Sequence, residues 1–228
     1  MSDENPNAAP LPFSDRHAAG RLLGALLKRR LAGTAGPGQT IVLALPRGGV
    51  AVAYEVARML AAPLDVLVTR KIGNPAQPEL GVGAIAEGGG PVYDAVLLRR
   101  LGLQPEDLAG VAEGARAELA RQVQVYRGGR PPPDVTGRHV VLVDDGLATG
   151  VTARAALRSL HANGAGRSVL AIPVAPRASA EEMLGHADDV VALATPPDFH
   201  SVGEWYTAFG QLSDEDVMAL LAHTVQQP

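Results

Sequence analysis

Short apolar runs recur along this chain, and they constrain its fold more than any other feature of the sequence. Each run is too short to span a membrane but long enough for a buried strand. Most are followed by a segment with helical periodicity. An alternation of apolar strands and helices predicts a doubly wound, mostly parallel sheet flanked by helices, in an α/β fold. The predicted strands are residues 40–45, 64–69, 80–86, 139–144, 168–175 and 189–195.

The predicted helices occupy the segments between these strands. The first begins at Ser14 or Asp15 and carries leucines at helical spacing as far as Gly33. Residues 94–127 are also helical in pattern, and Pro105 with the acids after it marks a helix start. Further helices are predicted at 49–61 and 152–163 and from about residue 214.

Length and charge limit what this chain can bind. A chain of 228 residues suits one α/β domain, expected here at residues 13–228. A net charge of −4 argues against general binding of nucleic acid, and no apolar run is long enough for a membrane helix. The first 12 residues lack the basic and apolar regions of a secretory signal. They predict a disordered tail on a cytoplasmic protein.

Two side-chain chemistries find no support in the sequence. The chain has no cysteine, which excludes thiol nucleophiles and thiolate metal ligands. Its six histidines lack the spacing of a transition-metal site.

The stretch RHVVLVDDGLATGVTA, residues 138–153, joins an apolar run to an acid pair, Asp144 and Asp145. Ligands of open α/β sheets bind beyond the carboxyl ends of the strands, and the start of the next helix can bind an anion. Because carboxylates repel phosphate, the acids would contact another part of the same ligand, such as sugar hydroxyls or a cation. A phosphorylated sugar meets both demands. The alternative is that the acid pair only caps a turn.

The full pattern is longer than an acid pair. Four apolar residues, two acids, glycine, two residues, threonine, glycine and a further threonine resemble the phosphoribosyl pyrophosphate (PRPP) signature of type I phosphoribosyltransferases. The resemblance extends from Phe13 to the C-terminal helix and is closer still to a branch of predicted phosphoribosyltransferases of unknown acceptor. Its other marks are LALPRGGV, RKIGNPAQPELGVGAIAEGG, YRGGRPPPDVTG, AIPVAP and FHSVGEWYTAF.

This resemblance implies an enzyme. It would transfer the 5-phosphoribosyl group of PRPP to a nitrogenous acceptor, such as a nucleobase or related heterocycle, with Mg²⁺ and release of pyrophosphate. Asp144 and Asp145 would hold the ribose hydroxyls and contribute to Mg²⁺ binding, while Arg70 and Lys71 would act from a mobile catalytic loop at 70–90. The pyrophosphate would contact Arg47, Gly48 and Gly49, and the 5′-phosphate would contact Gly146, Ala148, Thr149, Gly150, Val151 and Thr152.

The acceptor would lie under a hood, defined here as residues 196–212. Aromatic residues gather there in a chain that is only 4% aromatic, and we expect Phe199, Trp205 and Tyr206 to stack on a planar acceptor. A small satellite core that anchors the C-terminal helix is the alternative. Asp94, Glu87 and His200 are candidate proton acceptors, and the sequence does not choose among them.

Other functions remain open at this point. The same fold could serve a non-catalytic regulator that binds PRPP or a nucleotide, although the Arg70–Lys71 pair favours the enzyme. A synthetase would need an ATP-binding motif, and the sequence contains no Walker A pattern. By resemblance a homodimer is expected, with an apolar face of residues 105–126 as its contact.

Overall fold

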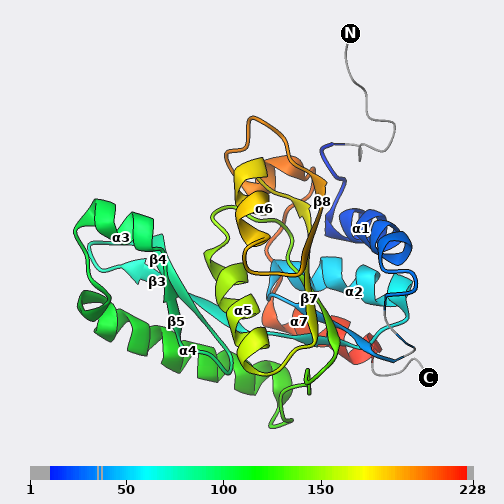
Figure 1. Ribbon diagram of the computed structural model, residues 1–228, viewed down its shortest axis with the longest axis horizontal. Helices are drawn as coiled ribbons and strands as arrows, with labels where there is room; N and C mark the ends of the chain where they lie inside the picture. The colour runs from blue at the N-terminus through cyan, green and yellow to red at the C-terminus, as the bar shows by residue number, and fades with distance from the viewer. Residues whose placement is uncertain (1–10, 35, 37, 225–228) are drawn as a thin grey trace.

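The computed structural model describes residues 11–34, 36 and 38–224 (Figure 1). At its centre is a five-stranded sheet in the order β2-β1-β6-β7-β8, in which every neighbouring pair is parallel. The strands are β1 (Thr40–Ala44), β2 (Leu64–Val66), β6 (His139–Val143), β7 (Arg167–Val174) and β8 (Asp189–Ala194). The predicted fold class is therefore confirmed.

Helices bury both faces of this sheet, which explains why its strands are continuously apolar. One face packs against α1 (Arg16–Arg30), α2 (Gly48–Leu60) and α7 (Asp214–Thr224), and the other against α5 (Val151–Ala162) and α6 (Arg177–Met183). In β6, Val141 and Val143 join the first core, while Val140 and Leu142 join the second. Asp15 caps α1 by accepting a hydrogen bond from the Ala18 N–H at 2.7 Å, as predicted.

The predicted strand at 80–86 does not belong to the parallel sheet. It is part of β4 (Gln77–Ala86), which pairs antiparallel with β3 (Thr69–Asn74) and β5 (Pro91–Tyr93) in a separate three-stranded sheet. The side chain of Asn74 accepts a hydrogen bond from the Ala76 N–H at 2.9 Å and closes a tight turn. Because this turn reverses the chain direction, β4 runs antiparallel to β3. The prediction that this strand belongs to the parallel sheet was therefore wrong.

Segment 70–90, expected as a mobile loop, therefore consists largely of strands. The predicted strand at 64–69 is divided in the same way, because β2 ends at Val66 and Thr69 already begins β3. Whether the hairpin moves during catalysis remains a prediction.

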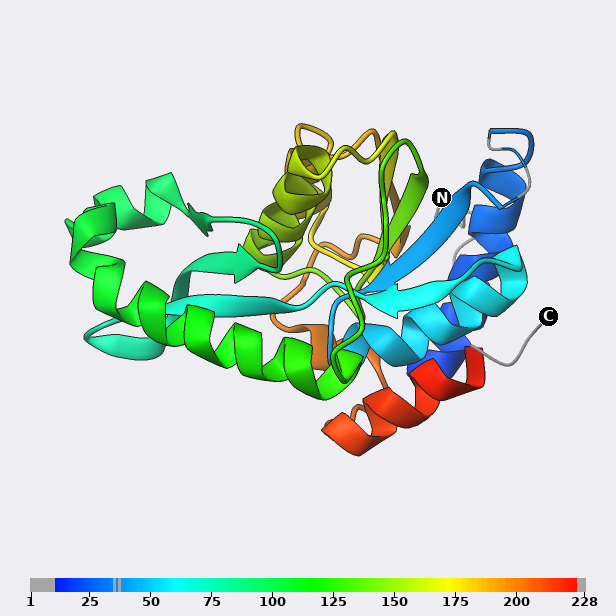
Figure 2. The ribbon, with the colours of Figure 1, turned by 90° about the horizontal axis from the view of Figure 1, so that it is seen from below.

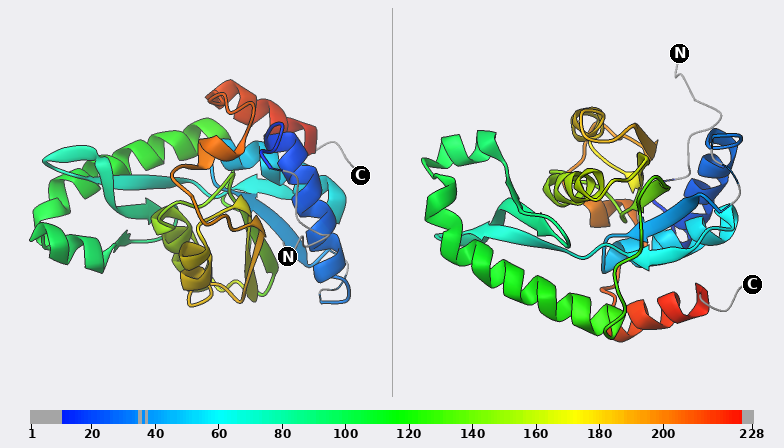
Figure 3. Two further views of the ribbon diagram at one scale, coloured as in Figure 1. Left: turned by 90° about the horizontal axis from the view of Figure 1, so that it is seen from above. Right: turned by 60° about the horizontal axis from the view of Figure 1, so that its bottom comes forward.

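Residues 69–127 form an arm that projects from the core (Figures 1 and 2). After β5 come α3 (Ala95–Leu101), a 3-10 turn at Pro105–Leu108 and α4 (Ala109–Arg127), so the helical pattern predicted over 94–127 is confirmed. The arm has its own small core, and α4 runs back from the tip to end beside α7 (Figure 3). This core consists of Ile72, Val82, Leu98, Leu108 and Ala112.

A buried arginine fastens the arm to the parallel sheet. The Arg127 side chain is only 2% exposed and pairs with Asp65 of β2 at 3.0 Å and with Glu87, just after β4, at 2.9 Å. It also donates to the Val66 carbonyl at 2.8 Å, so every N–H of the guanidinium has an acceptor. Removing one partner would leave a buried charge unpaired, which costs about 3–5 kcal/mol.

The structure does not support the expected apolar dimer face on residues 105–126. The large apolar side chains of α4 point inward, and its solvent-facing positions are alanine, glycine, glutamate, arginine and glutamine. Of the predicted tail, only Leu11 and Pro12 fall within the described residues. Across the described parts of the chain, no helix is long and apolar enough to cross a membrane.

Candidate active site

The acid pair directly follows β6, at the carboxyl end of the parallel sheet. Asp145 is held there by Arg16 from the start of α1, whose Nε and Nη2 both lie 2.8 Å from Oδ2. The side chains are only 10% and 16% exposed, so this ion pair is shielded from water. The Tyr206 hydroxyl donates to the backbone carbonyl of Asp145 at 2.5 Å. Asp145 is thus fixed through both its side chain and its backbone.

The predicted pyrophosphate loop lies against the acid pair. A Cβ at Gly48 would overlap Oδ2 of Asp145 and come within 3.1 Å of Arg16 Nε. At Gly49 a Cβ would lie 3.2 Å from Oδ1 of Asp144. Both positions therefore require glycine, and the two motifs meet in space although about a hundred residues of sequence separate them.

The predicted 5′-phosphate loop turns directly into α5. Gly150, with φ of 71°, occupies the left-handed region that favours glycine, and it precedes the first residue of the helix. Ala148 and Thr149 of the loop are exposed, whereas Gly150 and Val151 at the helix start are buried. Unpaired N–H groups and the helix dipole make such a position suited to an anion.

Arg70 and Lys71 lie on opposite faces of β3. Lys71 pairs with Ala84, which packs with Val151 at the start of α5, whereas Arg70 pairs with Ile85 on the other face. Lys71 is close enough to Asp144 for its charge to act on that carboxyl group. Arg70 instead lies near α4. The structure brings Lys71 toward the acid pair and turns Arg70 away from it.

Arg47 lies immediately before α2, and its side chain is 43% exposed. Its Nη1 is 3.8 Å from Oδ1 of Asp214 at the start of α7. The same carboxylate oxygen accepts a hydrogen bond from the Tyr126 hydroxyl at 2.5 Å. Arg47 thus borders the site, with a loose contact that a stronger anion can replace.

The two members of the acid pair differ electrostatically. Burial raises the pKa of Asp144 well above its ordinary value, and the neighbouring charge of Asp145 raises it further. The backbone N–H of Asp145, which donates to Asp144 Oδ1 at 2.9 Å, and the charge of Lys71 act in the opposite direction. A cation or a hydroxyl donor brought to this position would therefore relieve an unfavourable charge.

This raised pKa predicts how stability depends on pH. The folded state holds the Asp144 proton more tightly than the unfolded state, so this group favours folding at pH below 3.8 and that contribution is lost as pH rises through the raised pKa. We expect Asp144→Asn to remove this loss of stability with rising pH. Denaturant unfolding of the wild type and the variant, from below pH 3.8 upward, would measure it. A variant that kept the wild-type decline would contradict the assignment.

The matched control is Asp188→Asn, which should have the opposite effect. Hydrogen bonds from Ser168 lower the pKa of Asp188, so its contribution is present at higher pH and is lost as pH falls. Its replacement should destabilise the protein mainly above the ordinary carboxyl pKa.

The hood packs over the site, but its aromatic residues differ in availability. Tyr206 is 5% exposed and packs with Phe13 and Phe209 at ring distances of 5.5 and 5.0 Å, so it belongs to the satellite core. Phe199 and Trp205 are partly buried and nearly parallel, with ring centres 6.4 Å apart. Tyr206 therefore belongs to a satellite core, as the alternative expected, but this core contains no residue of α7 and so does not anchor the C-terminal helix. The Tyr206 hydroxyl is already committed to Asp145.

The candidate proton acceptors are not gathered at the acid pair. Glu87 is bound through both oxygens to Arg127, and Asp94 caps α3 by accepting from two backbone N–H groups. His200 is 80% exposed and 3.7 Å from Glu204. Glu87 and Asp94 thus have structural roles.

The acid pair suits a magnesium ion that is held mainly by its substrate. Carboxylate oxygens are ligands that Mg²⁺ prefers, and this ion usually keeps several water or phosphate ligands. Arg16 already occupies Oδ2 of Asp145. Within residues 11–34, 36 and 38–224, no group of three or more His, Cys, Asp or Glu side chains forms a complete cage. Asp144 and the free oxygen of Asp145 are the carboxylate ligands that remain here.

A separate cavity of about 320 Å³ lies away from the acid pair. It is bounded by β1, the end of α5 and residues 132–136, with Glu87 and Arg127 in its wall. The polar groups of that wall are engaged with one another, as Ser159 Oγ donates to the Glu87 carbonyl at 2.6 Å. We therefore assign the site to the acid pair and not to this cavity.

Arg16 is the functional residue that the sequence analysis missed. Its contact with Asp145 spans 129 residues, so no local motif reveals it. A signal was nevertheless present. Arg16 lies at the helical spacing of Gly20, Leu23 and Leu27, all on the buried face of α1. A charged residue on an apolar helix face requires a buried partner.

Comparison with known proteins agrees with this geometry. The model of the phosphoribosyl transferase domain matches residues 13–205. Two curated proteins from Mycobacterium tuberculosis strains, both named "Putative phosphoribosyl transferase", are 47% identical over 209 residues. The match covers 92% of this chain and 46% of each relative, so the chain spans about half the length of the curated relatives it matches.

Two solved structures share the fold of this chain. The crystal structure of TT1426 from Thermus thermophilus is 43% identical, with a TM-score of 0.75 over 92% of this chain and 98% of that one. The AQ2163 protein from Aquifex aeolicus, 11% identical with a TM-score of 0.50 over 97% of this chain and 95% of that one, shares the fold alone.

Proposed function

This chain belongs to the phosphoribosyl transferase domain family, and on that premise we propose that it transfers the 5-phosphoribosyl group of PRPP to a nitrogenous acceptor. The acceptor class is a nucleobase or a related nitrogen heterocycle, and pyrophosphate is the second product. The cytoplasmic location and the homodimer inferred from the sequence stay predictions.

One observation carries this proposal. The acid pair, the Gly48–Gly49 turn and the loop that leads into α5 lie together at the carboxyl end of the parallel sheet. PRPP carries a ribose between a 5′-phosphate and a pyrophosphate. One acidic group and two helix starts suit a sugar that carries two phosphate groups.

The proposed reaction breaks the bond between ribose C1 and a pyrophosphate oxygen, which keeps the electron pair. The acceptor nitrogen forms the new bond to C1 and loses its proton to water. Negative charge grows on the leaving pyrophosphate, so Lys71 and Arg47 would stabilise the transition state more than the ground state. The start of α5 would hold the 5′-phosphate and orient the ribose for attack.

Mg²⁺, when bound, would neutralise negative charge that grows on the leaving pyrophosphate. Asp144 and Asp145 are the residues that would contribute to its binding. Their part in the reaction is to accept hydrogen bonds from the ribose hydroxyls and to keep the sugar in place as C1 develops positive charge.

A non-catalytic regulator that binds PRPP or a nucleotide is the second candidate. The position of Lys71 supports the enzyme, because this residue shares a face with Ala84 and the start of α5 and is near Asp144. An enzyme needs a cation at this position because negative charge grows on the departing pyrophosphate.

A screen for PRPP-dependent pyrophosphate release tests the proposal. The protein would be incubated with PRPP, Mg²⁺ and single purines, pyrimidines or other nitrogen heterocycles, and PRPP binding would be measured by calorimetry in parallel. We expect release with at least one acceptor and formation of the corresponding nucleotide. Tight PRPP binding without release would favour the regulator, and absence of PRPP binding would exclude both.

A further inference from the structure

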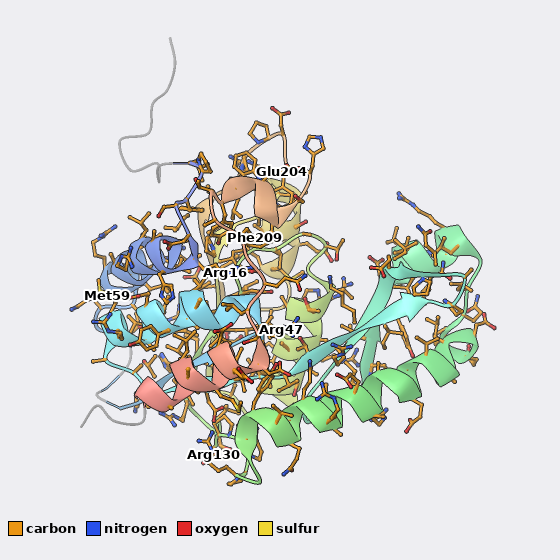
Figure 4. The ribbon with its side chains drawn as sticks, turned by 180° about the vertical axis from the view of Figure 1, so that it is seen from behind. Arg16, Arg47, Met59, Arg130, Glu204 and Phe209 are labelled. Carbon is orange, nitrogen blue, oxygen red and sulfur yellow. The ribbon has the colours of Figure 1, made fainter. Side chains whose placement is uncertain are left out.

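Arg16 contacts separate parts of the molecule, among them the hood, whose Phe209 lies beside it in Figure 4. It belongs to α1, and its Nε and Nη2 contact Oδ2 of Asp145 at 2.8 Å. Its Nη1 donates to the Gly210 carbonyl of the hood at 2.7 Å, and its guanidinium carbon lies 3.8 Å from the centre of the Phe209 ring. Gly48 of the pyrophosphate loop is the fourth neighbour.

These contacts make the two oxygens of Asp145 unequal. Oδ2 accepts a hydrogen bond from Arg16 Nε, lies 2.8 Å from Arg16 Nη2 and faces Gly48, where there is no room even for a methyl group. Oδ1 accepts from neither Arg16 nor Tyr206, and the neighbouring carboxyl group of Asp144 is close enough to form a side-chain hydrogen bond with the Asp145 carboxylate. The two contacts with Arg16 restrict rotation of the carboxylate about its Cβ–Cγ bond, while the Tyr206 hydroxyl fixes the backbone that carries it.

We propose that Arg16 determines how the enzyme recognises the ribose hydroxyls, by occupying Oδ2 of Asp145 and leaving Oδ1 as the oxygen that accepts from the sugar. This inference rests on the proposed function. It assigns Arg16 as a positioning residue, which acts through Asp145 and not on the reacting atoms.

The geometry of the Arg16 N–H donors distinguishes the positioning of Asp145 from a role in which Arg16 only holds the hood in place. A planar guanidinium can place two parallel donors on a carboxylate, stack on a ring and reach a carbonyl at the same time, whereas an ammonium group is a single point charge. Arg16→Lys therefore keeps the charge but loses the fixed orientation. Arg16→Gln loses both and frees the Asp145 carboxylate to rotate.

The experiment compares sugar phosphates that differ by one hydroxyl. Binding of ribose 5-phosphate, 2-deoxyribose 5-phosphate and 3-deoxyribose 5-phosphate would be measured by calorimetry for the wild type, Arg16→Gln and Arg16→Lys. A hydrogen bond to a charged group corresponds to a preference of about 10- to 100-fold for the sugar that carries the hydroxyl. We expect the wild type to show this preference for at least one position, Arg16→Gln to lose it and Arg16→Lys to retain only part.

The matched control is Arg30→Gln, in the same helix. Arg30 also forms a two-point ion pair, with Asp189 at 3.0 and 3.1 Å, but at the far end of α1. This variant should keep the wild-type preference, so a loss in Arg16→Gln alone cannot come from a weakened helix.

Two outcomes overturn the inference in different ways. If the wild type binds ribose 5-phosphate and prefers it, and Arg16→Gln is folded with the same preference, the role of Arg16 is wrong and the proposed function stands. If Arg16→Gln does not fold, the Arg16→Lys variant serves in its place. The full wild-type preference in Arg16→Lys would also contradict the role of Arg16. If the wild type binds neither ribose 5-phosphate nor PRPP, both the inference and the proposed function fail.

Discussion

Replacing the acid pair, in Asp144→Asn combined with Asp145→Asn, is expected to abolish PRPP-dependent pyrophosphate release. Loss of one preorganised electrostatic group at an active site typically lowers the rate by about 10²- to 10³-fold, and here both carboxylates that would hold the ribose are removed. PRPP binding should also weaken, since the hydroxyl acceptors become neutral amides. Pyrophosphate release and calorimetric PRPP titration measure the two effects.

The double variant should remain folded. Asp144→Asn removes a carboxyl group whose charged form is disfavoured by burial, which offsets part of the cost of leaving Arg16 without its ionic partner. Thermal unfolding would verify this. A folded double variant that bound PRPP as tightly as the wild type would refute the assigned site.

The chain offers a matched control in a second pair of adjacent aspartates, Asp188 and Asp189. Asp189 begins β8 and Asp188 precedes it, at the opposite end of the sheet from the acid pair. Asp188 accepts from the Ser168 N–H at 2.7 Å, and Asp189 pairs with Arg30. Asp188→Asn with Asp189→Asn should lower stability and leave pyrophosphate release close to the wild-type rate.

Lys71→Ala is expected to lower the rate of pyrophosphate release by about 10²- to 10³-fold, the usual cost of one transition-state donor. Lys71 is exposed on β3, so its removal should leave the free energy of unfolding almost unchanged. Because the charge it would neutralise grows as pyrophosphate departs, the fall should appear in kcat more than in KM for PRPP.

Lys28→Ala is the control, since Lys28 is the only other lysine in the sequence. It lies in the last turn of α1 and is exposed, away from the acid pair. Its replacement should change neither kcat nor KM. Equal activity of the Lys71→Ala variant and the wild type would remove the catalytic role of Lys71 and favour the regulator.

The parallel sheet could be predicted from the sequence because strands that are buried on both faces are continuously apolar. Val140 to Val143 are apolar on both sides of β6, so the run is continuous and easily recognised. The run at 80–86 is also free of polar side chains, but its direction depends on the turn closed by Asn74. Periodicity does not distinguish an antiparallel strand from a parallel one, and the hairpin was therefore missed.

The site was predictable only where its groups are neighbours in sequence. Asp144, Asp145 and the start of α5 follow one another, so the spacing of the motif carried their geometry. Arg16 and Tyr206 reach Asp145 from positions 129 and 61 residues away, and such contacts form only when the chain folds. The sequence also did not distinguish Arg70 from Lys71 as site residues, because the segment was expected to be a loop. Strand alternation places the two side chains on opposite faces of β3.

The two ends of the arm meet at one place. Thr69 follows β2 almost at once, and Arg127, the last residue of α4, is bonded to Asp65 within that strand. A contiguous segment whose two ends lie close together can be shortened, lengthened or exchanged between genes without changing the path of the rest of the chain. Residues 69–127 could therefore change as a unit during evolution while the strand order of the five-stranded parallel sheet is inherited unchanged.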